Sequence, residues 1–398
     1  MRIECFCPKL LPMNALMNTY ARFPLTLVRG QGSRVWDDAD NCYLDFISGI
    51  AVDTLGHAHP KMTQALSTQA ATLLHCSNLF NIPKQQQLAE KLCADSGLDA
   101  AFFCNSGAEA NEAAIKLARK YFYDQGSARR TVITATQSFH GRLLSTLTAT
   151  GQDKVKVGFD PLPPGFIHVP LNDLDALKAV ISRQSAAILL EPLQGEGGVN
   201  IANAAYLQGV RKLCDEHGML LMLDEVQTGI GRCGTMFAFE QAGVKPDILT
   251  LAKGLGGGVP IGAMLATDAV AASFGPGTHG STFGGNPLSC TAALTVLEVI
   301  ENESLLENVK ARGAQLMQGL KAMQARFPVI KEVRGQGLLI GAELSIEAAP
   351  LIAEARESGL LVLSAGPNVL RLLPPLNVSE AEVDEALVTL ASVMERTQ

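Results

Sequence analysis

Short hydrophobic runs alternate with amphipathic segments through the middle of the chain. The runs have the length and apolar character of buried strands. They lie at residues 101–104, 131–135, 186–190, 220–223 and 248–251. Apolar residues at helical spacing predict helices between them, including 107–123 and 206–217. This alternation is typical of a mainly parallel sheet that helices cover on both faces.

The pattern changes on both sides of this central region. Residues 33–46 alternate polar and apolar positions around an acidic turn, which predicts two short strands. After about residue 290 the predicted elements are two long helices, three strand-like runs and a last helix. They lie at 287–300, 305–327, 338–344, 360–363, 369–373 and 381–395.

The two ends of the chain are expected to build one smaller α+β domain together, because both flank the central region. We predict that segments 13–58 and 291–398 form this domain and that 59–290 form the large domain. Residues 1–12 are predicted to be a loose N-terminal extension.

Composition limits the class of protein. The 398 residues are 47% hydrophobic, which is enough for a large core and two or three domains of about 150 residues each. The net charge is −7 and no basic cluster is present, so nucleic acid is not an expected partner. No apolar run approaches the ~18 residues of a membrane-spanning helix, and the N-terminus lacks the apolar core of a signal peptide. We therefore expect a cytoplasmic protein without a membrane partner.

Cysteine and histidine spacing argues against a metal site. The nine cysteines are irregularly spaced and include no C-x-x-C pair, which is typical of reduced thiols. His57 and His59 have no cysteine or carboxylate at metal-ligand spacing in the sequence nearby.

Lys253 is the most informative candidate for chemistry. It follows the run at 248–251 and precedes a glycine-rich turn, and the run at 220–223 leads likewise into Asp224. Open α/β sheets bind ligands at the carboxyl ends of their strands. An amine enclosed there suits a Schiff-base lysine, and pyridoxal 5′-phosphate needs such an amine together with a carboxylate. Taken alone, the sequence around Lys253 also fits an alternative, a surface lysine that follows a strand.

Two loops with small hydroxyl side chains precede helices. Ser106, Gly107 and Ala108 begin the helix predicted at 107–123, and Ser281 and Thr282 lie in a second glycine-rich loop. Free backbone N–H groups at a helix start, with a hydroxyl beside them, can bind a phosphate. An ordinary helix cap by Ser106 is the alternative.

Four further side chains suit a planar or anionic ligand. Phe139 can stack on a ring, although a core phenylalanine is equally common, and Arg142 suits a carboxylate. Arg371 is the only charge in an apolar run, so it needs an anionic partner, either a substrate or a structural salt bridge. Glu196, in a glycine-rich loop, could be that partner or a gate.

These motifs, in this order, resemble those of the fold-type I, class III pyridoxal-phosphate aminotransferases. The resemblance runs from about residue 14 onward and is most specific in five segments. They are 105–112, 139–142, 224–229, Lys253 with its glycines, and 280–287. Within the family, the chain closely resembles the group that acts on N-acetylornithine in arginine biosynthesis. The resemblance implies a mainly parallel seven-stranded sheet in the large domain, a smaller α+β domain, and a homodimer with shared active sites.

The resemblance also implies which residues bind the cofactor. Lys253 is expected to bond to it covalently and to transfer a proton, and Asp224 to hold the ring nitrogen protonated. The remaining expected contacts are with the ring, its hydroxyl and its phosphate. They come from Ser106, Gly107, Ala108, Phe139, Val226, Gln227 and, from the neighbouring subunit, Thr282.

Substrate contacts are implied for Arg142, Ser281 and Arg371, with Arg371 taking the α-carboxylate. Glu196 is expected to pair with Arg371 or to swing away between half-reactions. The implied reaction converts N2-acetyl-L-ornithine and 2-oxoglutarate into N-acetyl-L-glutamate 5-semialdehyde and L-glutamate.

Three other interpretations stay open. A related ω-aminotransferase could act on succinylornithine, ornithine, succinyl-diaminopimelate or 4-aminobutyrate, since Asn81 stands where many relatives have a second aromatic residue. An aminomutase or decarboxylating transaminase would share the fold but not the need for 2-oxoglutarate. A nucleotide-binding protein built on residues 254–258 is disfavoured, because that stretch lacks the G-x-G-x-x-G pattern.

Overall fold

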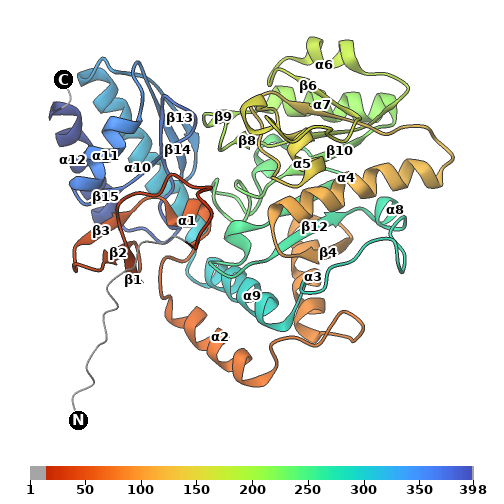
Figure 1. Cartoon of the computed structure of the whole chain (residues 1–398), viewed down its shortest axis with the longest axis horizontal. Coiled ribbons are helices and arrows are strands. Elements are labelled where there is room, and N and C mark those ends of the chain that lie inside the picture. The colour runs from red at the N-terminus through yellow and green to blue at the C-terminus, as the bar shows by residue number, and fades with distance from the viewer. Residues whose placement is uncertain (1–14, 397–398) are drawn as a thin grey trace.

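A seven-stranded sheet forms the centre of the large domain in the computed structural model, which describes residues 15–396 (Figure 1). The strand order is β4-β12-β11-β10-β7-β5-β6. Their bounds are β4 Ala100–Cys104, β5 Thr131–Ala135, β6 Phe166–Val169, β7 Ser185–Leu190, β10 Leu220–Asp224, β11 Ile248–Leu251 and β12 Gly262–Ala266. Every residue of β5, β7, β10, β11 and β12 is buried, which explains their nearly continuous apolar sequences.

Strands β6 and β12 were not predicted, and β12 runs antiparallel to both of its neighbours. Its sequence, Gly-Ala-Met-Leu-Ala, has no β-branched residue and therefore gives a weak strand signal. The other neighbouring pairs, β11–β10, β10–β7, β7–β5 and β5–β6, are parallel. The expected mainly parallel sheet is confirmed.

Helices cover both faces of this sheet, and successive residues of each strand point to opposite layers. Leu220 and Met222 pack in one apolar cluster with residues of α4 (Gly107–Asp124). Leu221 and Leu223 pack in the other, with residues of α7 (Ala204–His217). The shorter helical segments of this domain lie between the strands. They are α5 Leu144–Ala149, α6 Leu174–Val180, α8 Asp268–Ala271, η1 Asp153–Val155, η2 Ala238–Ala242 and η3 Lys253–Leu255. A small hairpin in the same domain pairs β8 (Leu193–Gln194) with β9 (Asn200–Ile201).

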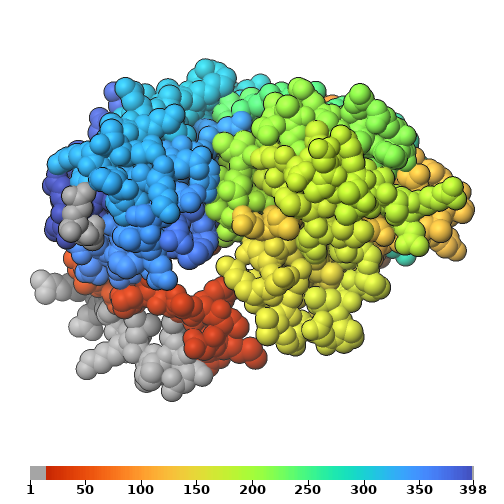
Figure 2. Space-filling model, turned by 90° about the horizontal axis from the view of Figure 1, so that it is seen from above, coloured from red at the N-terminus to blue at the C-terminus, as the bar shows by residue number. Residues whose placement is uncertain are grey.

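The two ends of the chain share one sheet, as expected. Strands β1 (Leu27–Gln31), β2 (Arg34–Asp37) and β3 (Cys42–Asp45) are joined by β15 (Leu360–Leu361), which pairs parallel with β3. In Figure 1 these N-terminal strands lie directly beside the blue C-terminal elements, and the space-filling view in Figure 2 shows the red N-terminal segment against the blue part of the molecule.

A second sheet completes the smaller domain, in the order β13-β14-β17-β16. Its bounds are β13 Ile330–Gln336, β14 Leu339–Leu344, β16 Leu363–Ser364 and β17 Val369–Leu372. Helices α10, α11 and α12 belong to the same domain. They span Leu305–Arg326, Ala349–Glu357 and Glu380–Arg396.

The single strand predicted at 360–363 is wrong, because the chain changes sheets within it. Leu360 and Leu361 pair with β3, whereas Leu363 and Ser364 pair with β17. Val362, between them, is buried. An apolar run that serves two sheets looks like one strand in the sequence.

The remaining helices lie beside the large sheet. Helix α9 (Pro287–Asn302) packs on α2 (Pro60–Thr72) and on α3 (Pro83–Ser96), and α1 (Ser48–Ala51) is a short turn near the site. No helix among residues 15–396 is long and apolar enough to cross a membrane. The extension predicted for residues 1–12 lies outside the described residues, and the predicted domain boundaries stay predictions.

Candidate active site

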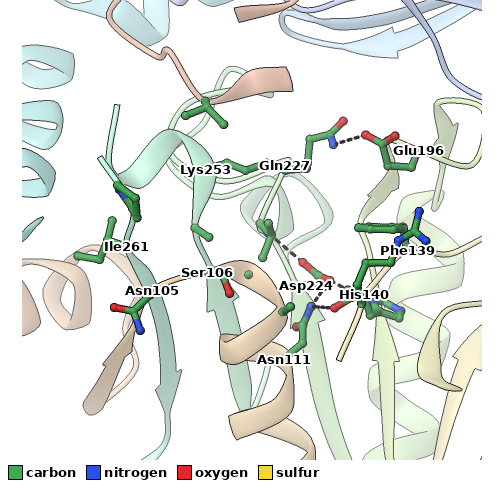
Figure 3. A pocket seen from close by; sticks show the side chains of 18 of the residues that line it. Asn105, Ser106, Asn111, Phe139, His140, Glu196, Asp224, Gln227, Lys253 and Ile261 are labelled. Carbon is green, nitrogen blue, oxygen red and sulfur yellow. Dashed lines mark hydrogen bonds and ion pairs between the residues drawn. The ribbon is translucent and has the colours of Figure 1, made fainter. Parts of the chain in front are cut away.

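A cavity of about 410 Å³ lies at the carboxyl ends of the central strands (Figure 3). This is large enough for a cofactor with a small substrate. Ten of the thirteen residues that sequence analysis proposed for the site line the cavity. They are Ser106, Gly107, Ala108, Phe139, Arg142, Glu196, Asp224, Val226, Gln227 and Lys253.

Asp224 ends β10 and is only 3% exposed. Its Oδ2 accepts hydrogen bonds from Asn111 Nδ2 at 2.7 Å and from His140 Nδ1 at 2.8 Å. Its Oδ1 accepts one from the backbone N–H of Val226 at 3.0 Å. These three donors hold the carboxylate in one orientation, so a buried anion is available to a cationic group in the cavity.

Asn111 and His140 were missed by the sequence analysis. Both are almost fully buried and line the cavity. Thr250 Oγ1 donates to Asn111 Oδ1 at 2.7 Å, which fixes the amide so that its NH₂ group faces Asp224. A signal was available, because Asn111 is a polar residue on the apolar face of its helix.

Lys253 follows β11 at the start of η3 and is half-buried. Its φ of 46° lies in the left-handed region, which costs about 1–2 kcal/mol for a residue with a side chain. Thr54 Oγ1 helps to hold the turn by donating to the carbonyl of Gly254 at 2.9 Å. Burial lowers the pKa of Lys253, and this favours a neutral, nucleophilic amine.

The loop between β4 and α4 offers an anion-binding cradle. The hydroxyl of Ser106 caps the helix by accepting from the backbone N–H of Glu109, so the predicted cap is present. The backbone N–H groups of Gly107 and Ala108 stand in the first turn, where a helix provides them no acceptor. A Cβ on Gly107 would lie 2.6 Å from Val226 Cγ1, so only glycine lets the loop approach so closely. The donors and the space fit a phosphate group.

Phe139 is half-buried in the cavity wall, and its backbone N–H donates to Glu191 Oε1 at 2.9 Å. Arg142 is exposed at the cavity, with its guanidinium 5.7 Å from the centre of the Phe139 ring. The cavity wall thus provides a flat apolar face, that of Phe139 (Figure 3), and a cation beside it.

Glu191 is a buried carboxyl that the sequence analysis did not assign to the site. It follows β7 just as Asp224 ends β10, and it lines the cavity. Burial and the nearby Asp224 raise its pKa well above the usual range. Glu191 accepts one hydrogen bond, from Phe139, whereas Asp224 accepts three, so the donors of the cavity wall are arranged around Asp224.

Arg371, from β17 of the smaller domain, is 2% exposed and does not itself line the cavity. It contacts two residues that do, Glu196 and Gln227. Its Nη1 donates to Glu196 Oε1 at 2.6 Å, to the carbonyl of Gly195 at 2.7 Å and to Gln227 Oε1 at 3.2 Å. Gln227 Nε2 also donates to Glu196, at 3.1 Å. Burial alone would raise the pKa of Glu196. The positive charges of Arg371 and Lys253 outweigh this effect and lower the pKa to about 2. The carboxylate therefore remains charged and paired.

Ser281 and Thr282 do not line the cavity. Ser281 Oγ accepts from Asn105 Nδ2 at 3.2 Å and from the backbone N–H of Gly284 at 2.9 Å, whereas Thr282 is exposed. Asn105 does line the cavity, so Ser281 stands one hydrogen bond away from it.

The structure corrects the spacing argument about His57. Ligand atoms of Asp45, Asp53 and His57 all lie within 4.8 Å of one another. His57 Nε2 and Asp45 Oδ2 are 2.8 Å apart, and Asp45 Oδ1 also accepts from the backbone N–H of Ile47 and Ser48. Asp53 precedes His57 by four residues and Asp45 precedes it by twelve, so the spacing argument overlooked both carboxylates. Asp45 supports the turn before α1.

Residues 16–394 match the aminotransferase class-III family. The chain belongs to this family. Its cofactor is pyridoxal 5′-phosphate, for which the residues of the cavity provide a buried carboxylate, an amine, an aromatic face and an anion cradle. The expected fold, with its seven-stranded sheet and smaller domain, is confirmed.

Known class III aminotransferases are similar to the chain over nearly its whole length. An acetylornithine aminotransferase from Thermosynechococcus vestitus is 56% identical over 391 residues, which cover 95% of each chain. The crystal structure of the N-acetylornithine aminotransferase from Stenotrophomonas maltophilia has a TM-score of 0.83 and 41% identity, with 95% and 97% coverage. The ornithine aminotransferase from Toxoplasma gondii has a TM-score of 0.92 and 34% identity, with 96% and 93% coverage.

The Gly107→Ala variant tests the anion cradle of this aminotransferase. The added methyl group collides with Val226, and overpacking of this kind costs about 1–3 kcal/mol, so we expect cofactor affinity to fall by roughly tenfold. The dissociation constant is measured by titrating apoenzyme with pyridoxal phosphate. The matched control is Gly275→Ala, because nothing lies within 4 Å of a Cβ at that position. Affinity should return in Gly107→Ala/Val226→Ala, and a double variant as weak as the single one would contradict the steric explanation.

Proposed function

We propose that this chain transfers the δ-amino group of N2-acetyl-L-ornithine to 2-oxoglutarate, giving N-acetyl-L-glutamate 5-semialdehyde and L-glutamate. The observation that carries the proposal is one cavity in which Lys253 and Asp224 lie together, with the Arg371–Glu196 pair at its edge. The names of relatives more than 50% identical to the chain support the choice of substrate.

When bound, pyridoxal phosphate supplies an electron-poor ring that accepts the electrons of a breaking C–H bond. Asp224 is placed to hold a proton on the ring nitrogen, because its fixed carboxylate stabilises a neighbouring positive charge. The Asp224 carboxylate does not have to reorient during the reaction, because Asn111, His140 and the backbone of Val226 already hold it in place.

Lys253 is proposed as the covalent anchor and as the acid and base of the reaction. Its amine takes the proton from the carbon that carries the substrate amino group and later returns a proton to the other side of the C–N bond. A positioned acid–base group of this kind contributes about 10²–10⁴ in rate. The lowered pKa of Lys253 serves this role, because only the neutral amine can accept a proton.

The other cavity residues are proposed to bind and orient the cofactor. Ser106, Gly107 and Ala108 hold its phosphate, and Val226 packs behind Gly107. Phe139 stacks on the ring, and Gln227 donates to the ring hydroxyl.

Arg371 and Glu196 are proposed to let one cavity accept two different substrates. 2-Oxoglutarate carries a carboxylate at each end, so its α-carboxylate needs the guanidinium of Arg371. Glu196 occupies that guanidinium at 2.6 Å when no second carboxylate is required. Arg142, which lines the cavity, is then available to contact the carboxylate of the acylated substrate, with Ser281 one hydrogen bond away from the cavity.

We infer a homodimer in which the loop with Thr282 completes the cavity of the partner subunit. Thr282 is exposed and outside its own cavity, although its hydroxyl would suit a phosphate. Large apolar side chains are exposed in the same region and would be covered by a second copy. They include Leu79, Phe80 and Phe283, which are 90%, 68% and 60% exposed.

Ornithine is the second candidate donor, because ornithine aminotransferases are among the similar solved structures. Parallel titration of the holoenzyme with N-acetylornithine, ornithine and succinylornithine separates the candidates by the concentration at which the yellow colour is lost. We expect N-acetylornithine to act at the lowest concentration and 2-oxoglutarate to restore the colour. A stronger response to ornithine would move the assignment to that donor.

Lys253→Ala tests the proposed chemistry. We expect turnover to fall by about 10²–10⁴-fold, because the base is lost, while the cofactor still binds noncovalently. Steady-state rates and the retention of cofactor on gel filtration measure the two effects. Lys212→Ala is the control, since that side chain is 76% exposed on the outer surface of α7. Near-normal turnover in Lys253→Ala would rule out its assigned role.

A further inference from the structure

Glu196 lies between two cavities. It lines the active-site cavity described above and also a second cavity of about 330 Å³. In Figure 3 it stands at the edge of the active-site cavity, with Gln227 between it and Lys253. The carboxylate points to Arg371 and Gln227, and the side chain is 29% exposed.

The backbone around Glu196 is held in place on both sides. Arg371 Nη1 donates to the carbonyl of Gly195 at 2.7 Å, Asn200 Nδ2 to that of Gly197 at 3.0 Å and Arg334 Nη2 to that of Gly198 at 2.7 Å. A Cβ at Gly195 would lie 1.9 Å from Gln227 Oε1, and one at Gly197 would lie 2.1 Å from the carbonyl oxygen of Gln137. This close packing leaves rotation of the Glu196 side chain as the way to release Arg371, without a movement of the loop.

The second cavity offers a cation to a carboxylate that leaves Arg371. Lys154 is the only basic residue that lines it, and its ammonium makes no ion pair with the described residues. Besides Glu196, Asp153 is the one acidic residue of the described chain that lines this cavity, and its fully exposed carboxylate lies 3.5 Å from Lys156 Nζ. Side-chain amides of Gln137 and Gln152 provide further hydrogen-bonding groups in the wall.

We propose that the second cavity receives the Glu196 side chain when it leaves Arg371, and that Lys154 is a positioning residue that stabilises this outward state. The inference rests on the proposed function, because only an enzyme with two substrates needs Arg371 both paired and free. Lys154 then acts on the affinity for a dicarboxylate through Glu196, without contacting the ligand.

The expected effect follows from the populations of the two states. A ligand of Arg371 binds only the outward state. Its apparent dissociation constant is therefore the intrinsic constant divided by the fraction of protein in that state. Removing an exposed ion pair lowers the outward population by about two- to fivefold. The affinity for a ligand of Arg371 should fall by the same factor.

Lys154→Met tests this in the holoenzyme, with glutarate as a dicarboxylate that cannot react. Calorimetric titration should show a dissociation constant for glutarate about two to five times higher than that of the unaltered enzyme, and added salt should remove the difference. Lys156→Met is the matched control, because it removes the same charge from the same loop but does not line the second cavity. That variant should bind glutarate like the unaltered enzyme.

The Glu196→Ala background separates an indirect effect from a direct one. Without the carboxylate there is nothing for Lys154 to hold, so Lys154→Met should no longer change the affinity for glutarate. An equal loss of glutarate affinity in that background would show that Lys154 attracts the ligand itself. No loss of affinity in either background would show that the outward state lies elsewhere. Either result overturns the inference. If N-acetylornithine fails to discharge the yellow colour of the unaltered enzyme, the proposed function is wrong, and this result is independent of the glutarate affinities.

Discussion

The Asp224 carboxylate is 3% exposed, and a buried charge costs several kcal/mol unless polar groups compensate it. Asn111, His140 and the Val226 backbone provide that compensation. Burial and the nearby Asp224 raise the pKa of Glu191, which favours its neutral form beside this anion. Burial lowers the pKa of Lys253 although Asp224 opposes this effect, and the neutral amine is favoured there too. The protonated ring nitrogen of pyridoxal phosphate is a cation that suits the Asp224 carboxylate.

The sheet explains why these groups meet, and the smaller domain explains how one cavity can accept two substrates. Glu191, Asp224 and Lys253 come from the adjacent strands β7, β10 and β11, whose carboxyl ends share one edge. Arg371 comes from a different sheet and is tied to this edge by Glu196. The cofactor chemistry and the recognition of substrate carboxylates thus rest on separate parts of the fold, joined by one ion pair.

Much of this arrangement could be predicted from local sequence. The strands at 131–135 and 248–251 have the predicted bounds, and Lys253 and Asp224 line one cavity as their positions after buried runs implied. What could not be predicted depends on contacts between distant segments. Strand β12 has a weak local signal, the run at 360–363 serves two sheets, and the partners of Asp224 lie 84 and 113 positions away.

The central claim is that the fixed charge of Asp224 makes C–H cleavage possible in this cavity. It is tested most directly by the rate at which the δ-hydrogens of N-acetylornithine exchange with deuterium in the Asp224→Asn holoenzyme, followed by NMR. Asparagine keeps the size of the side chain but removes its charge. We predict that exchange slows by about 10²–10³-fold, the range seen when one stabilising polar group is removed from a reaction centre. Exchange at the rate of the unaltered enzyme, with the cofactor fully bound, would contradict the account.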